Sequence, residues 1–222
     1  MTGPDAAFPS TGVLDCGNAG AMIANLRANL LRLLCKMAAF LALVVLISCG
    51  GVPTDEPTDA IKIAELAHEI AALGPKVDPE EARRAARIAV SYPRQLAISY
   101  QITDSPIVHN AKVNRGARPR GLCWHWAEDL EKRLAQEGFV TLDLHRAIAN
   151  YRTAFRIEHS TVIVSRRGGR MESGLVLDPW RWGGTLYWGP VRNDTAYPWR
   201  PQREVLADKR RRHAGSRAVK SH

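Results

Sequence analysis

The hydrophobic pattern of this chain changes its period once, at Gly138, and this change restricts the folds open to it. Before Gly138, a helix is predicted over 122–136, where apolar side chains recur every fourth residue: Leu122, Trp126, Leu130 and Leu134. After Gly138, short apolar runs are typical of strands, and they lie at 139–144, 161–165, 174–177 and 185–188. Helices followed by a small antiparallel sheet predict an α+β fold.

Two further helices are predicted before this one. Residues 58–73 place apolar side chains at helical spacing. The sequence Asp78-Pro79-Glu80-Glu81 is typical of a helix start, because proline suits the first turn and acidic groups favour the positive end of the helix dipole. We expect this second helix to be interrupted at Pro93, with residues 96–102 resuming as helix and residues 103–120 forming a loop.

The sequence pattern of the N-terminal part is typical of a targeting signal. Residues 37–47 are apolar and uncharged, which is shorter than the roughly 20 residues of a membrane-spanning helix. Basic residues precede the run: Arg27, Arg32 and Lys36. The following Leu46-Ile47-Ser48-Cys49-Gly50 resembles a bacterial lipobox, in which the cysteine is lipidated and becomes the new N-terminus. An uncleaved membrane anchor or a buried helix is the alternative interpretation.

The net charge of +9 is concentrated at the other end of the chain. Residues 200–222 carry eight basic and two acidic side chains, a net +6, whereas the segment 49–199 carries about +2. A terminal block of like charge is typical of a solvated, disordered tail and sometimes of contact with anionic surfaces. Nucleic acid is therefore disfavoured as the main partner.

Of the four cysteines, only Cys123 is predicted to be a free thiol in the processed chain. Cys16 and Cys35 precede the cleavage point, and Cys49 is the predicted lipidation site. Cys123 lies in the first turn of the predicted helix 122–136. The free N–H groups and partial positive charge of a helix N-terminus favour a thiolate and can stabilise an oxyanion. This position predicts a nucleophile.

A base and an orienting carboxylate follow in the chain. His159 precedes the strand 161–165, and Asp178 follows the strand 174–177. If these strands pair through the turn at Gly168-Gly169, His159 and Asp178 lie opposite one another, as a carboxylate that orients an imidazole requires.

These residues resemble a known family. The matching segments are Gly121-Leu122-Cys123-Trp124, Glu158-His159-Ser160 and Leu177-Asp178-Pro179-Trp180, within about residues 115–190. They are similar to the transglutaminase-like branch of papain-like cysteine enzymes. The resemblance implies that Cys123 is the nucleophile, His159 the general base and acid, and Asp178 the orienting group. It also implies a nucleophile-bearing helix packed on an antiparallel sheet. Alternatively, the three residues have packing and turn-forming roles only.

Other polar residues are rival candidates. His145 is the main alternative base and Asp143 the alternative carboxylate, whereas His125 projects away from Cys123 on the same helix. Asn114 is the candidate second oxyanion donor. The sequence contains no HExxH, CxxC or EF-hand motif, so we predict no metal and no cofactor.

All six tryptophans lie between residues 124 and 199. Trp124, Trp180 and Trp182 flank the candidate nucleophile and carboxylate, and are candidates to bind an extended peptide by stacking. The alternative is a core role, which is favoured for Trp126 on the apolar stripe of its helix.

Together these features predict a lipid-anchored enzyme of the cell envelope, on the periplasmic or extracytoplasmic face. Residues 1–48 form the signal peptide, with Met22 as an alternative start, residues 49–59 the lipidated tether, 60–200 the catalytic domain and 201–222 the disordered basic tail. We expect a cysteine peptidase, amidase or transglutaminase-type acyltransferase acting on peptides or proteins of the envelope. The alternatives are a non-catalytic binding module on the same fold, or a binder of anionic surfaces through the tail.

Overall fold

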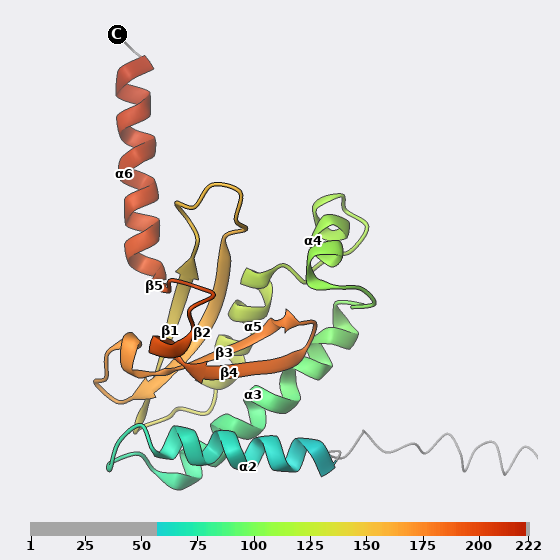
Figure 1. The fold of residues 1–222 in the computed structure, drawn as a ribbon, viewed down its shortest axis with the longest axis vertical. Helices are drawn as coiled ribbons and strands as arrows, with labels where there is room; N and C mark the ends of the chain where they lie inside the picture. The colour runs from blue at the N-terminus through green and yellow to red at the C-terminus, as the bar shows by residue number, and fades with distance from the viewer. Residues whose placement is uncertain (1–56, 221–222) are drawn as a thin grey trace, which may run out of the picture. The chain divides into compact units, whose positions relative to one another are not determined.

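The computed structural model describes residues 57–220, which form an α+β fold of five helices and a five-stranded antiparallel sheet (Figure 1). The predicted α+β class is therefore confirmed. The predicted signal peptide, the lipidation site Cys49 and most of the tether lie outside the described residues. No helix within residues 57–220 is both long and apolar enough to cross a membrane.

Two helices begin the described chain, α2 (Pro57–Ala71) and α3 (Pro79–Ser99). Asp78 caps α3 as expected, because its carboxylate accepts hydrogen bonds from the backbone N–H groups of Glu80 and Glu81. The predicted interruption at Pro93 is wrong, since α3 continues through this residue. Its buried face extends past the proline to Leu96 and Tyr100, and this burial offsets the lost helical hydrogen bond.

The predicted loop 103–120 contains a short helix, α4 (Pro106–Asn114). Pro106 occupies its first turn, where a missing N–H costs nothing. His109 is fully buried in α4, and its Nε2 atom lies 2.9 Å from the backbone oxygen of Arg120. This tertiary contact stabilises a helix that the local sequence pattern does not indicate.

The sheet has the strand order β4-β3-β2-β1-β5 and every neighbouring pair is antiparallel. Its strands are β1 (Leu142–Ala149), β2 (His159–Arg166), β3 (Leu175–Trp182), β4 (Thr185–Pro190) and β5 (Arg200–Pro201). The first predicted strand starts too early. The N–H groups of Val140 and Thr141 bind the carboxylate of Glu81 at 2.7 and 2.8 Å instead of a neighbouring strand.

The register between β2 and β3 differs by two residues from the predicted one. Val162 pairs with Leu177, so the residue opposite Asp178 in this register would be Thr161 and not His159. A shift of two residues keeps every side chain on its face of the sheet, whereas a shift of one would reverse it. His159 and Asp178 therefore become diagonal neighbours on one face, still within reach of each other.

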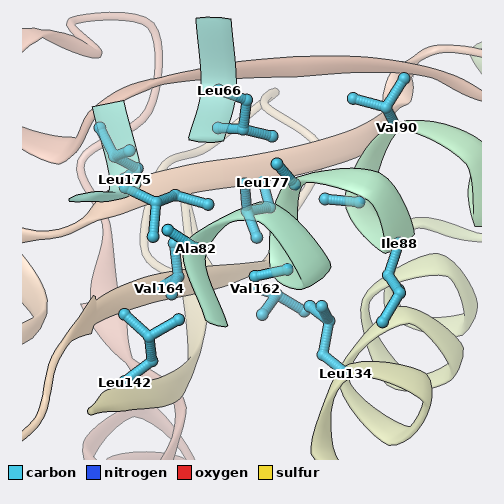
Figure 2. Packing of buried hydrophobic residues seen from close by; sticks show 14 of the residues in the cluster. Leu66, Ala82, Ile88, Val90, Leu134, Leu142, Val162, Val164, Leu175 and Leu177 are labelled. Atoms are coloured by element: carbon cyan, nitrogen blue, oxygen red, sulfur yellow. The ribbon is translucent and has the colours of Figure 1, made fainter. Parts of the chain in front are cut away.

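Helices pack on one face of the sheet. The helix α5 (Cys123–Ala135) buries Leu130 and Leu134 of its predicted stripe there, together with residues of α2 and α3. Figure 2 shows this core, in which Val162 and Val164 of β2 and Leu175 and Leu177 of β3 meet the helical side chains. The opposite face carries a smaller cluster that includes Ile163, Val176 and Trp199.

The C-terminal segment that the sequence predicts to be a disordered tail is helical in this structure, where α6 occupies Gln202–Lys220. Figure 1 shows α6 beginning beside β5 and running away from the sheet. Val205 is fully buried, and Asp208 forms ion pairs with Arg152 and Arg212. The segment is therefore held by apolar burial and by charge pairing, which a count of its basic residues does not show.

Candidate active site

The N-terminus of α5 is held by two side chains of its own first turns. Nδ1 of His125 accepts hydrogen bonds from the N–H groups of Gly121 and Leu122, both at 3.1 Å. Trp126 donates its indole N–H to the oxygen of Gly121 at 3.0 Å. Burial, followed by the nearby Arg120 charge, lowers the pKa of His125, so its ring is neutral and can accept both bonds. His125 thus shapes the turn before Cys123.

Cys123 lies at the first position of α5 and is 8% exposed. It belongs to a buried cluster with Leu96, Tyr100, Trp126 and Trp180. Its thiol donates a hydrogen bond to the backbone oxygen of Glu158 at 3.6 Å. Glu158 directly precedes His159, so this contact brings the thiol to the start of β2.

His159 and Asp178 form a buried pair. Nε2 of His159 lies 2.5 Å from Oδ2 of Asp178, and the exposed fractions of the two residues are 1% and 0%. The other ring nitrogen, Nδ1, is buried and has no hydrogen-bond partner within residues 57–220. The imidazole therefore presents one nitrogen to a carboxylate and keeps the other free.

The charge state of this pair follows from its surroundings. Burial alone would lower the pKa of His159, but the Asp178 carboxylate and, less strongly, the Cys123 thiol raise it to about 9. Burial would raise the pKa of Asp178, yet His159 and Arg181 hold it below its usual range. At neutral pH the pair is therefore an imidazolium bound to a carboxylate.

Aromatic rings surround the imidazole. The ring centroids of Trp180 and Tyr197 each lie 4.6 Å from that of His159, and the centroid of Trp199 lies at 5.3 Å. Such rings exclude water and favour a cation between them. Of the predicted substrate-binding residues, Trp180 is buried in this wall, whereas Trp124 and Trp182 are 47% and 58% exposed.

The rival residues have other partners. Nε2 of His145 lies 2.8 Å from the hydroxyl of Ser165, and Asp143 binds Arg167 and the N–H of Gly168. Asn114 is exposed at the end of α4. A different amide, Asn110, accepts the indole N–H of Trp180 at 3.2 Å.

The loop 150–158, between β1 and β2, contacts the thiol through the backbone oxygen of Glu158. It is tied to α6 by ion pairs of Lys209 with Glu158 at 2.5 Å and of Arg152 with Asp208 at 2.7 Å. Two surface hollows of about 570 and 380 Å³ are lined by residues other than Cys123, His159 and Asp178. Cys123, His159 and Asp178 are all buried in this structure.

Residues 57–220 contain no group of three or more His, Cys, Asp or Glu side chains placed to hold a metal ion. Comparison of the chain with protein-family models, with curated proteins and with solved structures finds no match. The interpretation of the site therefore depends on its own geometry and chemistry.

Proposed function

We propose that this protein is a thiol enzyme with a Cys123–His159–Asp178 triad on a transglutaminase-like, papain-like core, acting on amide or isopeptide bonds. The observation that carries the proposal is the buried imidazole of His159. One of its nitrogens is bound to Asp178 and the other has no partner, and the thiol at the N-terminus of α5 lies beside it. A buried polar atom without a partner is costly in a purely structural site.

The proposed reaction is acyl transfer through a thioester. The Cys123 thiolate attacks the amide carbonyl carbon, and the negative charge on the carbonyl oxygen is stabilised at the N-terminus of α5. Protonated His159 gives its proton to the leaving amine as the C–N bond breaks. Water or a second amine then gives up a proton to His159 and attacks the thioester carbonyl, and the C–S bond breaks to release the Cys123 thiolate. Water yields an acid, and an amine yields a cross-link.

The substrates we propose are peptides or proteins of the cell envelope, with the membrane reached through a lipid on Cys49. No cofactor or metal is needed for this chemistry. The burial of the thiol, which is 8% exposed, favours one alternative, a binding module that keeps the fold without turnover.

Reactivity of the thiol distinguishes these two functions. The full chain is treated with iodoacetamide between pH 4 and pH 9, and modification of Cys123 is followed by mass spectrometry. An isolated cysteine, with a pKa near 8.5, is almost fully protonated at pH 6. We expect wild-type Cys123 to react at pH 6 about tenfold faster or more than Cys123 in His159→Gln, since the imidazolium stabilises a thiolate. His145→Gln is the matched control and should react like the wild type. Equal rates in the wild type and His159→Gln would exclude an activated pair.

Access to the thiol should depend on the contacts between α6 and the loop 150–158. Lys209→Ala removes the ion pair with Glu158, and exposed pairs of this kind are worth up to about 1 kcal/mol. We therefore expect alkylation of Cys123 to become up to about fivefold faster, with added salt having a similar effect on the wild type. Arg210→Ala changes an exposed side chain of the same helix and serves as the control. Unchanged rates in both Lys209→Ala and high salt would show that α6 does not control access.

A further inference from the structure

The carboxylate of Asp178 has a partner that the proposed mechanism does not use. Its Oδ2 atom lies 2.5 Å from Nε2 of His159 and also accepts a hydrogen bond from Nε of Arg181 at 2.7 Å. Its Oδ1 atom accepts the backbone N–H of Trp180 at 3.1 Å. Because the guanidinium and the imidazole share one oxygen, the position of Arg181 determines where that oxygen lies relative to the imidazole.

Arg181 is anchored at its other end. Its Nη1 donates to Oδ1 of Asp194 at 3.2 Å, and its Nη2 forms a second, shorter bond to Oδ2 of the same residue. Asp194 also accepts the indole N–H of Trp199 at 2.8 Å, and Trp199 packs against the ring of His159. The contacts thus connect His159 through Asp178, Arg181, Asp194 and Trp199 back to the His159 ring.

Aromatic rings hold the guanidinium in place. Its central carbon lies 3.8 Å from the ring centroid of Tyr187 and 4.5 Å from that of Tyr197. The side chain of Arg181 is 12% exposed and that of Asp194 is 2% exposed. A planar guanidinium paired with two carboxylates and stacked on rings has few other orientations available.

We propose that Arg181 is the positioning residue of this site: by bridging Asp178 and Asp194, it aims the Asp178 carboxylate at His159 and offsets part of its negative charge. The inference deepens the proposed function and rests on it for its rate measurement. Arg181 does not reach the reacting atoms and acts only through Asp178.

The charge of Arg181 has a defined consequence at His159. The titratable and charged groups that face this network are Cys123 of α5, Arg156 of the loop 150–158, Asp178 and Arg181 of β3, Tyr187 of β4, and Asp194 and Tyr197 before β5. The residue of β1 that pairs with His159 is Ala149, which has no charge. Arg181 is the cation bound to the same Asp178 oxygen as His159. Its removal should therefore make the imidazolium harder to deprotonate.

Two substitutions separate the charge of Arg181 from its bridging geometry. Arg181→Gln removes the charge, whereas Arg181→Lys keeps it but lacks the planar fork that bridges two carboxylates. In full-length Arg181→Gln, we expect the NMR titration midpoint of His159 to rise by about 0.5–2 pH units, as Coulomb's law gives for charges roughly 6 Å apart at an effective dielectric constant of about 80 to 20. In Arg181→Lys the midpoint should stay near that of the wild type.

The rate of Cys123 alkylation at pH 6 gives the second measurement. We expect this rate to fall about 10–100-fold in Arg181→Gln and by less in Arg181→Lys. A loss of this size is typical when a residue that hydrogen-bonds to a functional side chain and orients it is removed. An unchanged His159 midpoint in a folded Arg181→Gln variant would overturn the inference, whatever its rate. If Arg181→Gln does not fold, a rate in Arg181→Lys equal to that of the wild type would overturn it. A shifted midpoint in a chain whose wild type shows no activated thiol would leave the positioning role intact and remove the enzyme function.

Discussion

Replacement of Cys123 by alanine should abolish amide hydrolysis and acyl transfer. Loss of the nucleophile in a triad enzyme lowers kcat by about 10⁶-fold, because the remaining groups cannot form the covalent intermediate. The measurement is release of primary amine from a mixture of short peptides and isopeptides by the full chain. Since Cys123 is a small side chain in a buried cluster, the alanine variant should keep its fold, which circular dichroism checks.

A matched control is available within the chain. Cys35→Ala removes a thiol from the predicted signal peptide and should leave the activity of the wild type unchanged. Turnover in Cys123→Ala that is equal to that of the wild type would show that the thiol is not the nucleophile. Retained binding of a peptide with no turnover in either protein would favour the binding-module alternative.

The second large effect is expected from Asp178→Asn. An amide in place of the carboxylate keeps the shape of the side chain but no longer stabilises the imidazolium or its tautomer. In Ser-His-Asp enzymes the same change lowers kcat by about 10⁴-fold. Asp143→Asn, which changes the rival carboxylate on β1, should cost little activity, because Asp143 binds Arg167 and the N–H of Gly168 and not His159. Equal losses in the two variants would contradict the assigned role of Asp178.

The same substitution should change the pH dependence of stability. The pKa of His159 is raised from the ordinary value of 6.5 to about 9 in the folded protein, so its protonation favours the native state. This contribution to the free energy of unfolding is fully present below about pH 6.5 and is lost as the pH rises through about 9. Urea unfolding at pH 6, 7.5 and 9 should show this loss in the wild type, and a smaller one in Asp178→Asn. If Asp178→Asn is unfolded, His159→Gln replaces it and should likewise lose the pH-dependent step.

Local patterns in the sequence were sufficient to predict some elements and not others. The helix beginning at Cys123 was predicted from its four-residue spacing, and the β-like runs after Gly138 correspond to strands of the sheet. Helix α4 could not be predicted in this way, because the buried contact of His109 with Arg120 contributes to its stability. The helical state of α6 likewise depends on burial of Val205 and on distant ion pairs.

The candidate site was predicted in part for a similar reason. The order of Cys123, His159 and Asp178 along the chain placed all three near one end of the sheet, and a two-residue error in register did not separate the last two. Arg181 was missed, although its position three residues after Asp178 was visible. The proposed role of Arg181 depends on its hydrogen bonds to Asp194, which lies in an irregular segment. The sequence pattern of such a segment does not predict where its residues lie in the fold.

The most direct test of the coupled thiol and imidazole is an NMR titration of the His159 ring in the wild type and in Cys123→Ala, with His159→Gln used for assignment. In the wild type the ring should be protonated at pH 7 and titrate near pH 9. In Cys123→Ala the midpoint should be lower, because the contribution of the thiol is lost. A ring that is neutral at pH 7, or a midpoint that is the same in both proteins, would contradict the coupling on which the proposed enzyme depends.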